Sequence, residues 1–275
     1  MSLSFRRVLP ASRYFLRSQH TEIGVVAHEK LGNVENYPGH IKTSFLQKCL
    51  LSLGSGIGCL INPRRADLLS TFGETSGELA LRQIFNRMLS HPDGCRILRD
   101  RPTIRTNTVD LDSLRKLPEG TFGKAYTKFL DKYGYSPDER HYVKFVDDQD
   151  LAYIMLRYRE IHDLVHTLLG QPTDMLGEVV VKWVEGIQTL LPMCLTGGYF
   201  GSLRLAPKQT KRFVESHLEY AIHTGREARF LMCVYFEEHW EDNLEDFRSS
   251  LNIQSPPPPE NWIEMCFEAL SIVTL

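Results

Sequence analysis

The sequence predicts an all-α fold built as a single helical domain. Apolar residues recur at i, i+3, i+4 and i+7 in several segments, whereas no segment alternates apolar and polar residues over the length of a strand. Glycine or proline follows the clearest helical segments. With 275 residues the chain has room for one large domain or two small ones, and it contains no internal repeat.

Helical spacing and chain breaks together give the expected elements. The longest, over 148–169, ends at Gly170 and Pro172, since glycine commonly ends a helix and proline cannot continue one. Thr224 is placed to cap a helix over 226–240. The expected helices cover residues 78–89, 121–133, 148–169, 175–189, 208–222, 226–240 and 261–271, and prolines at 256–259 stiffen the connector before the last.

Two runs without charged residues, 49–63 and 186–203, contain too many breaks to span a membrane. A spanning helix needs about 20 predominantly apolar residues, whereas Pro192 and several glycines interrupt the second run. The glycines at 54, 56 and 58 favour close helix packing instead. Either run could line an apolar cavity or lie against a membrane surface, with burial in the core as the alternative.

Charge and motifs exclude several classes of function. The formal net charge is −2 and no dense stripe of lysine and arginine is present, so nucleic acid is not an expected partner. The chain has neither a phosphate-binding P-loop nor a GxGxxG motif before a helix, so it gives no support for ATP or dinucleotide binding. Its six cysteines are scattered without a CxxC, which is typical of free thiols in a reducing compartment.

The first twenty residues differ from the rest of the chain. They contain four arginines and several serines, and no acidic residue precedes Glu22. Because arginines interrupt every apolar run, the apolar core of a secretory signal is missing. This composition predicts a mitochondrial transit peptide over 1–20 and a helical domain over 21–275, with a disordered basic tail as the alternative.

The segment around residues 160–166 predicts a metal site. His162 and His166 are four residues apart, so their side chains lie on one face of a helix about one turn from each other. Asp163 is adjacent to the first, and Glu178 can return from the helix that follows the break. Two imidazoles with one or two carboxylates form a ligand set that zinc and iron favour, with Asp163 binding the ion directly or orienting an imidazole.

This pattern differs from two well-known metal motifs. The HExxH of metalloproteases has glutamate where this chain has Asp163, whose shorter side chain reaches a bound water less easily. An HD-type phosphohydrolase adds an upstream histidine and a downstream aspartate, and His141 and Asp174 are poorly spaced for those roles. No serine or cysteine lies in a recognisable nucleophile elbow.

The metal pattern also resembles that of a known family. The segment His162–Asp163–Leu164–Val165–His166, followed after eleven residues by Glu178, is similar to the HDxxH…E signature of the Coq4 family of mitochondrial ubiquinone-biosynthesis proteins. Segments 101–104, 117–123 and 142–170 agree with the family, and the resemblance covers roughly 43–253.

The resemblance implies a specific function. It implies an all-helical protein that binds zinc through His162, Asp163, His166 and Glu178, with these residues in the catalytic centre. It also implies peripheral association with the matrix side of the inner mitochondrial membrane, in a multi-protein coenzyme Q assembly. The implied reaction removes the C1 carboxylate of a polyprenylated 4-hydroxy-3-methoxybenzoate, coupled in some accounts to hydroxylation at that carbon.

The chemistry of this reaction constrains the site. Loss of CO₂ puts charge on the ring, so a metal would hold the carboxylate or stabilise the phenolate para to it. A tetrahedral zinc with four protein ligands is closed to substrate, so we expect Asp163 or Glu178 to bind weakly or only to support a ligand. Zinc has no redox chemistry, so coupled hydroxylation requires iron or another route to activate oxygen.

Three further expectations concern the lipid and the rival functions. We expect residues 186–203 to form an apolar channel for the isoprenoid tail, with plain core packing as the alternative. The main rival function is a non-catalytic lipid-binding scaffold with a structural metal. An HD-type metal phosphohydrolase is the third class.

Overall fold

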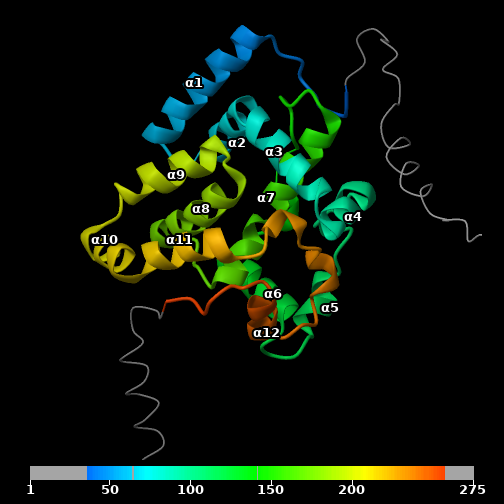
Figure 1. Ribbon diagram of the computed structural model, residues 1–275, viewed down its shortest axis with the longest axis vertical. Helices are drawn as coiled ribbons and strands as arrows, with labels where there is room; N and C mark the ends of the chain where they lie inside the picture. Colours follow the sequence, from blue (N-terminus) through cyan, green and yellow to red (C-terminus); the bar gives the residue numbers. More distant parts are fainter. Residues whose placement is uncertain (1–35, 64, 141, 258–275) are drawn as a thin grey trace, which may run out of the picture. The chain divides into compact units, whose positions relative to one another are not determined.

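The computed structural model describes residues 36–63, 65–140 and 142–257, and its regular elements there are helices (Figure 1). The one β pairing among these residues is an isolated bridge between Thr121 and Asn243. The predicted all-α fold is therefore confirmed. In chain order the α-helices are α1 (Phe45–Ile61), α2 (Ala66–Ser76), α3 (Glu78–Leu89), α4 (Pro92–Asp100), α5 (Leu111–Arg115), α6 (Phe122–Tyr133), α7 (Gln149–Leu169), α8 (Met175–Thr189), α9 (Pro192–Ser202), α10 (Pro207–Arg212), α11 (Leu218–Glu227) and α12 (Leu244–Ser250).

Helix α7 runs through the hydrophobic core. Its N-cap Asp148 accepts hydrogen bonds from the N–H groups of Asp150 and Leu151, at 2.9 and 3.1 Å, and Gly170 ends it with a φ of +60°. Helices α3, α6 and α8 pack against it, and Figure 1 shows it in the middle of the described ribbon. Because most of its side chains are buried, the polar ones require partners inside the protein.

A tight turn sets the start of α8. Asp174 caps this helix, accepting a hydrogen bond of 2.8 Å from the N–H of Gly177. A Cβ on Gly177 would lie 2.0 Å from the carbonyl oxygen of Pro172, so only glycine lets the turn pack onto the first turn of α8. The turn thereby fixes Glu178 in the first turn of α8, directed toward α7.

The clearest sequence patterns predicted their helices well. Helices α3, α6, α7 and α8 begin and end within one residue of the expected ranges. The expected close packing is confirmed at two of the three glycines of α1, because a Cβ on Gly56 would lie 3.3 Å from Phe72 and one on Gly58 would lie 2.6 Å from Leu68. Both neighbours belong to α2, which packs along α1. The expected packing is wrong at Gly54, which has open space around it.

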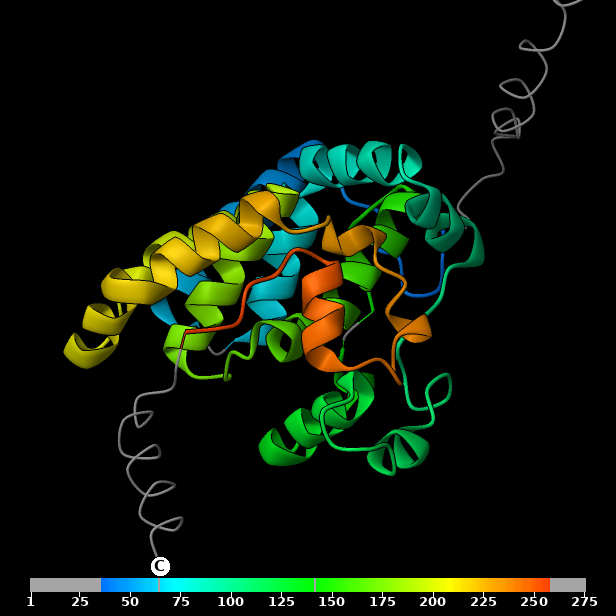
Figure 2. The same cartoon turned by 60° about the horizontal axis from the view of Figure 1, so that its bottom comes forward.

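The expected helix over 226–240 is wrong. Helix α11 continues through Thr224 and Gly225 to Glu227 and lies alongside α8 (Figure 2). Gly225 serves this contact, since a Cβ there would lie 2.9 Å from Ile187. Thr224 is therefore a buried residue inside a helix, and not an N-cap.

The segment after α11 is held in an irregular path by buried side chains. The Gln188 amide donates to the carbonyls of Ala228 and Arg229, at 3.3 and 3.2 Å, and its oxygen accepts from Leu231 N–H at 3.0 Å. The segment then forms two 3₁₀ turns, Leu231–Cys233 and Phe236–Glu238. The helix expected over 208–222 is also modified, because a π-helical stretch, Phe213–His217, separates α10 from α11.

Two sequence predictions fall on residues outside the described part of the chain. These are the transit peptide over 1–20 and the terminal helix over 261–271. None of the helices in the described ranges is both long and apolar enough to cross a bilayer.

Candidate metal centre

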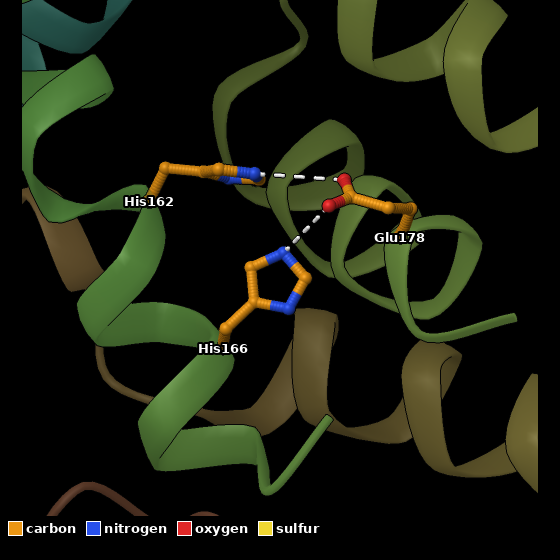
Figure 3. A group of neighbouring side chains, drawn as sticks. All are labelled: His162, His166 and Glu178. Atoms are coloured by element: carbon orange, nitrogen blue, oxygen red, sulfur yellow. Dashed lines mark ion pairs between the residues drawn. The ribbon is translucent and has the colours of Figure 1, made fainter. Parts of the chain in front are cut away.

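Three of the predicted ligands meet between α7 and α8. His162 and His166 project from α7, and the carboxylate of Glu178 from α8 lies between their rings (Figure 3). The Nε2 atom of His162 is 3.6 Å from Glu178 Oε2, and that of His166 is 3.3 Å from Glu178 Oε1. One ligand atom from each residue lies within 4.8 Å of the others. Tetrahedral zinc ligands about 2.0–2.1 Å from the ion lie roughly 3.3 Å apart, so these side chains are close to that spacing.

Each imidazole is held from behind through its other nitrogen. Nδ1 of His162 is 2.7 Å from Glu185 Oε1, and Nδ1 of His166 is 3.1 Å from the main-chain carbonyl of Gln171. A carboxylate and a carbonyl oxygen only accept hydrogen bonds, so both Nδ1 atoms donate. In the neutral rings the lone pairs are therefore on Nε2, the two atoms directed at Glu178.

This arrangement fits a divalent cation. Two Nε2 lone pairs facing a carboxylate repel it unless a positive charge lies among them, either on the rings or as an ion. The Nε2 atom of His166 is buried and has no hydrogen-bond partner in the described structure. A buried nitrogen lone pair normally has a partner, and a metal ion would supply one here. Two imidazoles and one carboxylate also form the protein ligand set of catalytic zinc and of non-haem iron.

The electrostatics keep Glu178 in the form that binds a metal. Burial raises its pKa, but the close approach of the His162 and His166 imidazoles outweighs burial and holds the pKa well below its usual range. Burial lowers the pKa of His162, whereas the Glu185 charge more than compensates and raises it. Glu178 is therefore a charged carboxylate at neutral pH.

Asp163 does not reach this centre. Its carboxylate pairs with the Arg140 guanidinium, from the loop before α7, and its side chain is only 4% exposed. Burying an unpaired charge costs free energy, and the Arg140 guanidinium offsets this cost for the Asp163 carboxylate. The structure therefore brings together three of the four predicted side chains and directs the fourth to Arg140.

Sequence reasoning missed a buried polar cluster behind His162. Glu185 Oε2 accepts hydrogen bonds from Tyr158 Oη at 2.6 Å and from Lys182 Nζ at 2.8 Å. Tyr158 Oη is also 3.0 Å from Cys194 Sγ. One signal was available, because Glu185 follows Glu178 by seven residues, which is two helical turns and hence the same face of α8.

Comparisons with known proteins identify the family of this chain. A family model described as "Coenzyme Q (ubiquinone) biosynthesis protein Coq4" matches residues 37–257. The mitochondrial ubiquinone biosynthesis protein COQ4 homolog of Aedes aegypti is 51% identical over 214 residues, 78% of each chain. The Homo sapiens homolog is 46% identical over 221 residues, 80% of this chain and 83% of its own.

A solved structure shows the same fold. The crystal structure of a putative ubiquinone biosynthesis protein from Nostoc punctiforme has a TM-score of 0.60 and 21% identity, covering 74% of this chain and 97% of that one. At this identity the likeness concerns the fold alone. With the family match over most of its length, the chain belongs to the Coq4 family of coenzyme Q (ubiquinone) biosynthesis proteins.

Proposed function

We propose that this protein is a metal-dependent carbon–carbon lyase of ubiquinone biosynthesis, acting on a polyprenylated 4-hydroxy-3-methoxybenzoate. The observation that carries the proposal is the convergence of His162, His166 and Glu178 on one point, with both Nδ1 atoms already occupied. Three protein ligands leave a coordination position for substrate, whereas four would close the site. The pairing of Asp163 with Arg140 supports a role for Asp163 outside the ligand set.

The ligand set is compatible with zinc and with iron. When bound, the metal supplies a Lewis acid that polarises the carboxylate or the phenolate para to it. Breaking the bond between C1 and the carboxylate releases CO₂ and leaves the electron pair on C1, where a proton is then added. If C1 is hydroxylated instead, one atom of dioxygen enters the ring and the other is reduced to water by two electrons from an added reductant. This reaction requires a redox-active metal such as Fe²⁺ or another route to activate oxygen.

The protein side chains prepare the site for this chemistry. Glu185 and the Gln171 carbonyl direct both Nε2 atoms outward from α7. Glu178 is 38% exposed, whereas His166 is 1% exposed, so the centre lies where the interior opens to the outside. An entering substrate would therefore meet Glu178 first, with the histidines behind it.

We also propose that the protein works on the matrix side of the inner mitochondrial membrane, within a multi-protein coenzyme Q assembly. The homologs from Aedes aegypti and Homo sapiens are named as mitochondrial, which supports this compartment. Exposed large apolar side chains on α1 and α9 support peripheral contact with lipid. They are Phe45, Leu46, Leu50, Leu53, Ile57, Leu60 and Ile61 on α1, and Leu195, Tyr199 and Phe200 on α9.

The two helices belong to one region of the fold. Helix α2 packs against both (Figure 1). The Arg204 guanidinium, just beyond α9, also donates to the Leu60 carbonyl at the end of α1. Gly201 brings α9 close to α8, since a Cβ there would lie 2.7 Å from Val179. Residues 186–203 therefore connect the metal helix to an apolar surface, which supports their proposed role in holding the isoprenoid tail.

The decisive experiment uses pure protein with defined metal content. It is incubated with the prenylated acid, and the product is identified by its mass. Glu178→Gln should abolish turnover, whereas Glu219→Gln should not, although each residue lies in the first turn of a helix. Loss of CO₂ alone indicates plain decarboxylation, and loss of CO₂ with gain of oxygen indicates the oxidative reaction.

Other outcomes favour the rival functions. Undiminished turnover after complete metal removal would refute the metal-dependent mechanism. A metal-loaded protein that binds the lipid without converting it would be a scaffold with a structural metal. Hydrolysis of a phosphoester would indicate a phosphohydrolase, although the pairing of Asp163 with Arg140 already disfavours an HD-type ligand set.

A further inference from the structure

A buried cluster of ionisable side chains lies behind His162, on the side of the ring away from Glu178. Tyr158, Lys182, Glu185 and Cys194 are all buried, and hydrogen bonds connect them. Moving a charged group out of water costs several kcal/mol per ion, and well-packed apolar residues would fill the space at no such cost. Apolar side chains would therefore fill the core between α7, α8 and α9 at a lower free-energy cost than this cluster does.

The two oxygens of Glu185 have different partners. Oε1 accepts from Nδ1 of His162 at 2.7 Å, while Oε2 accepts from Lys182 and Tyr158. Lys182 Nζ also lies 3.0 Å from Tyr158 Oη. Because two donors hold one oxygen, the carboxylate cannot turn away from the imidazole without breaking two buried hydrogen bonds.

The two histidines of the metal centre are supported differently. His166 donates to the neutral carbonyl of Gln171, whereas His162 donates to a carboxylate. A carboxylate behind an imidazole fixes its tautomer and makes its free nitrogen a stronger electron donor. Of the two rings, His162 therefore gains most from its supporting partner.

We propose that Glu185 is a positioning residue for the metal centre, holding His162 with Nε2 directed at the ion, and that Lys182 and Tyr158 hold Glu185 in turn. This inference rests on the proposed metal function and adds residues outside the ligand set. Glu185 touches neither metal nor substrate and acts through His162. Lys182 balances the charge of Glu185, so the cluster can remain buried.

The test measures cobalt binding, which requires no turnover. Co²⁺ is titrated into apo-protein, the dissociation constant is obtained by competition with a chelator, and the visible absorption of bound cobalt reports its ligand geometry. Glu185→Gln is expected to weaken cobalt binding about 10–100-fold and to alter the spectrum. Glu74→Gln is the control: it changes another buried carboxylate, which pairs with Arg159 and not with a histidine, so it should leave the cobalt affinity unchanged.

A double variant separates positioning from folding. Glu185→Gln alone leaves the Lys182 ammonium buried without its partner, which can destabilise the fold. Glu185→Gln combined with Lys182→Met removes both charges and leaves no unpaired ion in the interior. The proposal predicts that this double variant folds but binds cobalt as weakly as Glu185→Gln does. Lys182→Met alone retains Glu185 behind His162, so it should bind cobalt more tightly than the double variant.

The results distinguish this inference from the proposed function. If the wild-type protein binds cobalt stoichiometrically and the folded double variant matches its affinity and spectrum, the positioning role is refuted and the metal centre stands. If the wild-type protein binds no cobalt at this centre, both the metal function and the inference fail. Weakened binding in the double variant, with Glu74→Gln close to wild type, supports the inference.

Discussion

Replacing Asp163 with asparagine should leave metal binding nearly unchanged and lower the stability of the fold slightly. The carboxylate of Asp163 pairs with Arg140 and does not join His162, His166 and Glu178. Asparagine keeps a neutral acceptor for the guanidinium, so the buried position loses charge but retains its hydrogen bond. Metal affinity should fall less than about tenfold, the lower limit for loss of a supporting partner.

The cost to stability follows from the unequal exposure of the pair. The Arg140 side chain is 30% exposed and can reach water, whereas the Asp163 side chain is 4% exposed. Removing one partner of a fully buried pair costs about 3–5 kcal/mol. We therefore expect about 1–2 kcal/mol for Asp163→Asn, which leaves the arginine. For Arg140→Met, which leaves the buried carboxylate unpaired, we expect about 3–4 kcal/mol.

Thermal unfolding and cobalt titration check both parts. At roughly 2–4 °C per kcal/mol for a domain of this size, Asp163→Asn should lower Tm by about 2–8 °C and Arg140→Met by about 6–16 °C. The variant that combines Asp163→Asn with Arg140→Met should be more stable than Arg140→Met alone, because it no longer carries the buried carboxylate of Asp163. If Asp163→Asn melts like wild type yet loses cobalt as completely as Glu178→Gln, Asp163 is a ligand and our three-ligand centre is wrong.

Three further predictions address the surface, the turn and the metal. In a vesicle sedimentation assay, Leu53→Glu should weaken binding to neutral phosphatidylcholine vesicles roughly tenfold or more, since burying a leucine is worth about 1.5–3 kcal/mol. Leu79→Glu, on the exposed face of α3, is the control and should not change vesicle binding. In urea denaturation, Gly177→Ala should destabilise the protein because its Cβ meets the Pro172 carbonyl, while Gly54→Ala, with open space around it, should stabilise it by up to about 1 kcal/mol. Zinc at about 100 times its dissociation constant should stabilise the apo-protein by about 2.7 kcal/mol, and an unchanged Tm would argue against a bound ion.

The centre of the fold could be predicted because local signals there agree with the tertiary structure. The apolar spacing within 148–169 and the break at Gly170 give α7 almost to the residue. The i, i+4 spacing of His162 and His166 then places both rings on one face before any partner is known. Only the turn before α8 had to be right for Glu178 to reach them, and Gly177 and Asp174 form that turn.

Where prediction failed, contacts distant in sequence determined the outcome. The Thr224–Gly225 pair indicated a break, yet Gly225 lies inside α11 because α8 passes close to it. The segment after α11 is irregular because the side chain of Gln188, about forty residues earlier, forms hydrogen bonds with its main-chain groups. Neither contact leaves a local pattern, so propensity alone predicted a helix there.

Composition alone also gave no information on which side of a helix faces water. The run 49–63 lacks charge and could equally be core or surface, yet Leu50, Leu53 and Ile57 of α1 are all more than half exposed. Helix α1 packs on α2 through its small residues, so its larger apolar residues are left outside. A helix that is apolar all round does not show from sequence which stripe is buried.

The most informative signal in the metal helices is charge on a face that packing should keep apolar. Helix α8 carries Glu178, Lys182 and Glu185 on the side that meets α7, although the residues between them are four valines and a tryptophan. Each buried charge costs free energy, so such residues persist where they do something that an apolar side chain cannot. The spacing of Glu178 and Glu185 therefore indicates that one helix supplies both a metal ligand and the residue that supports His162. The His162 ring lies between the two carboxylates, with Nε2 facing Glu178 and Nδ1 facing Glu185. If Glu185 were only a packing residue, replacing it together with Lys182 by uncharged residues of similar size would stabilise the protein and leave cobalt binding intact.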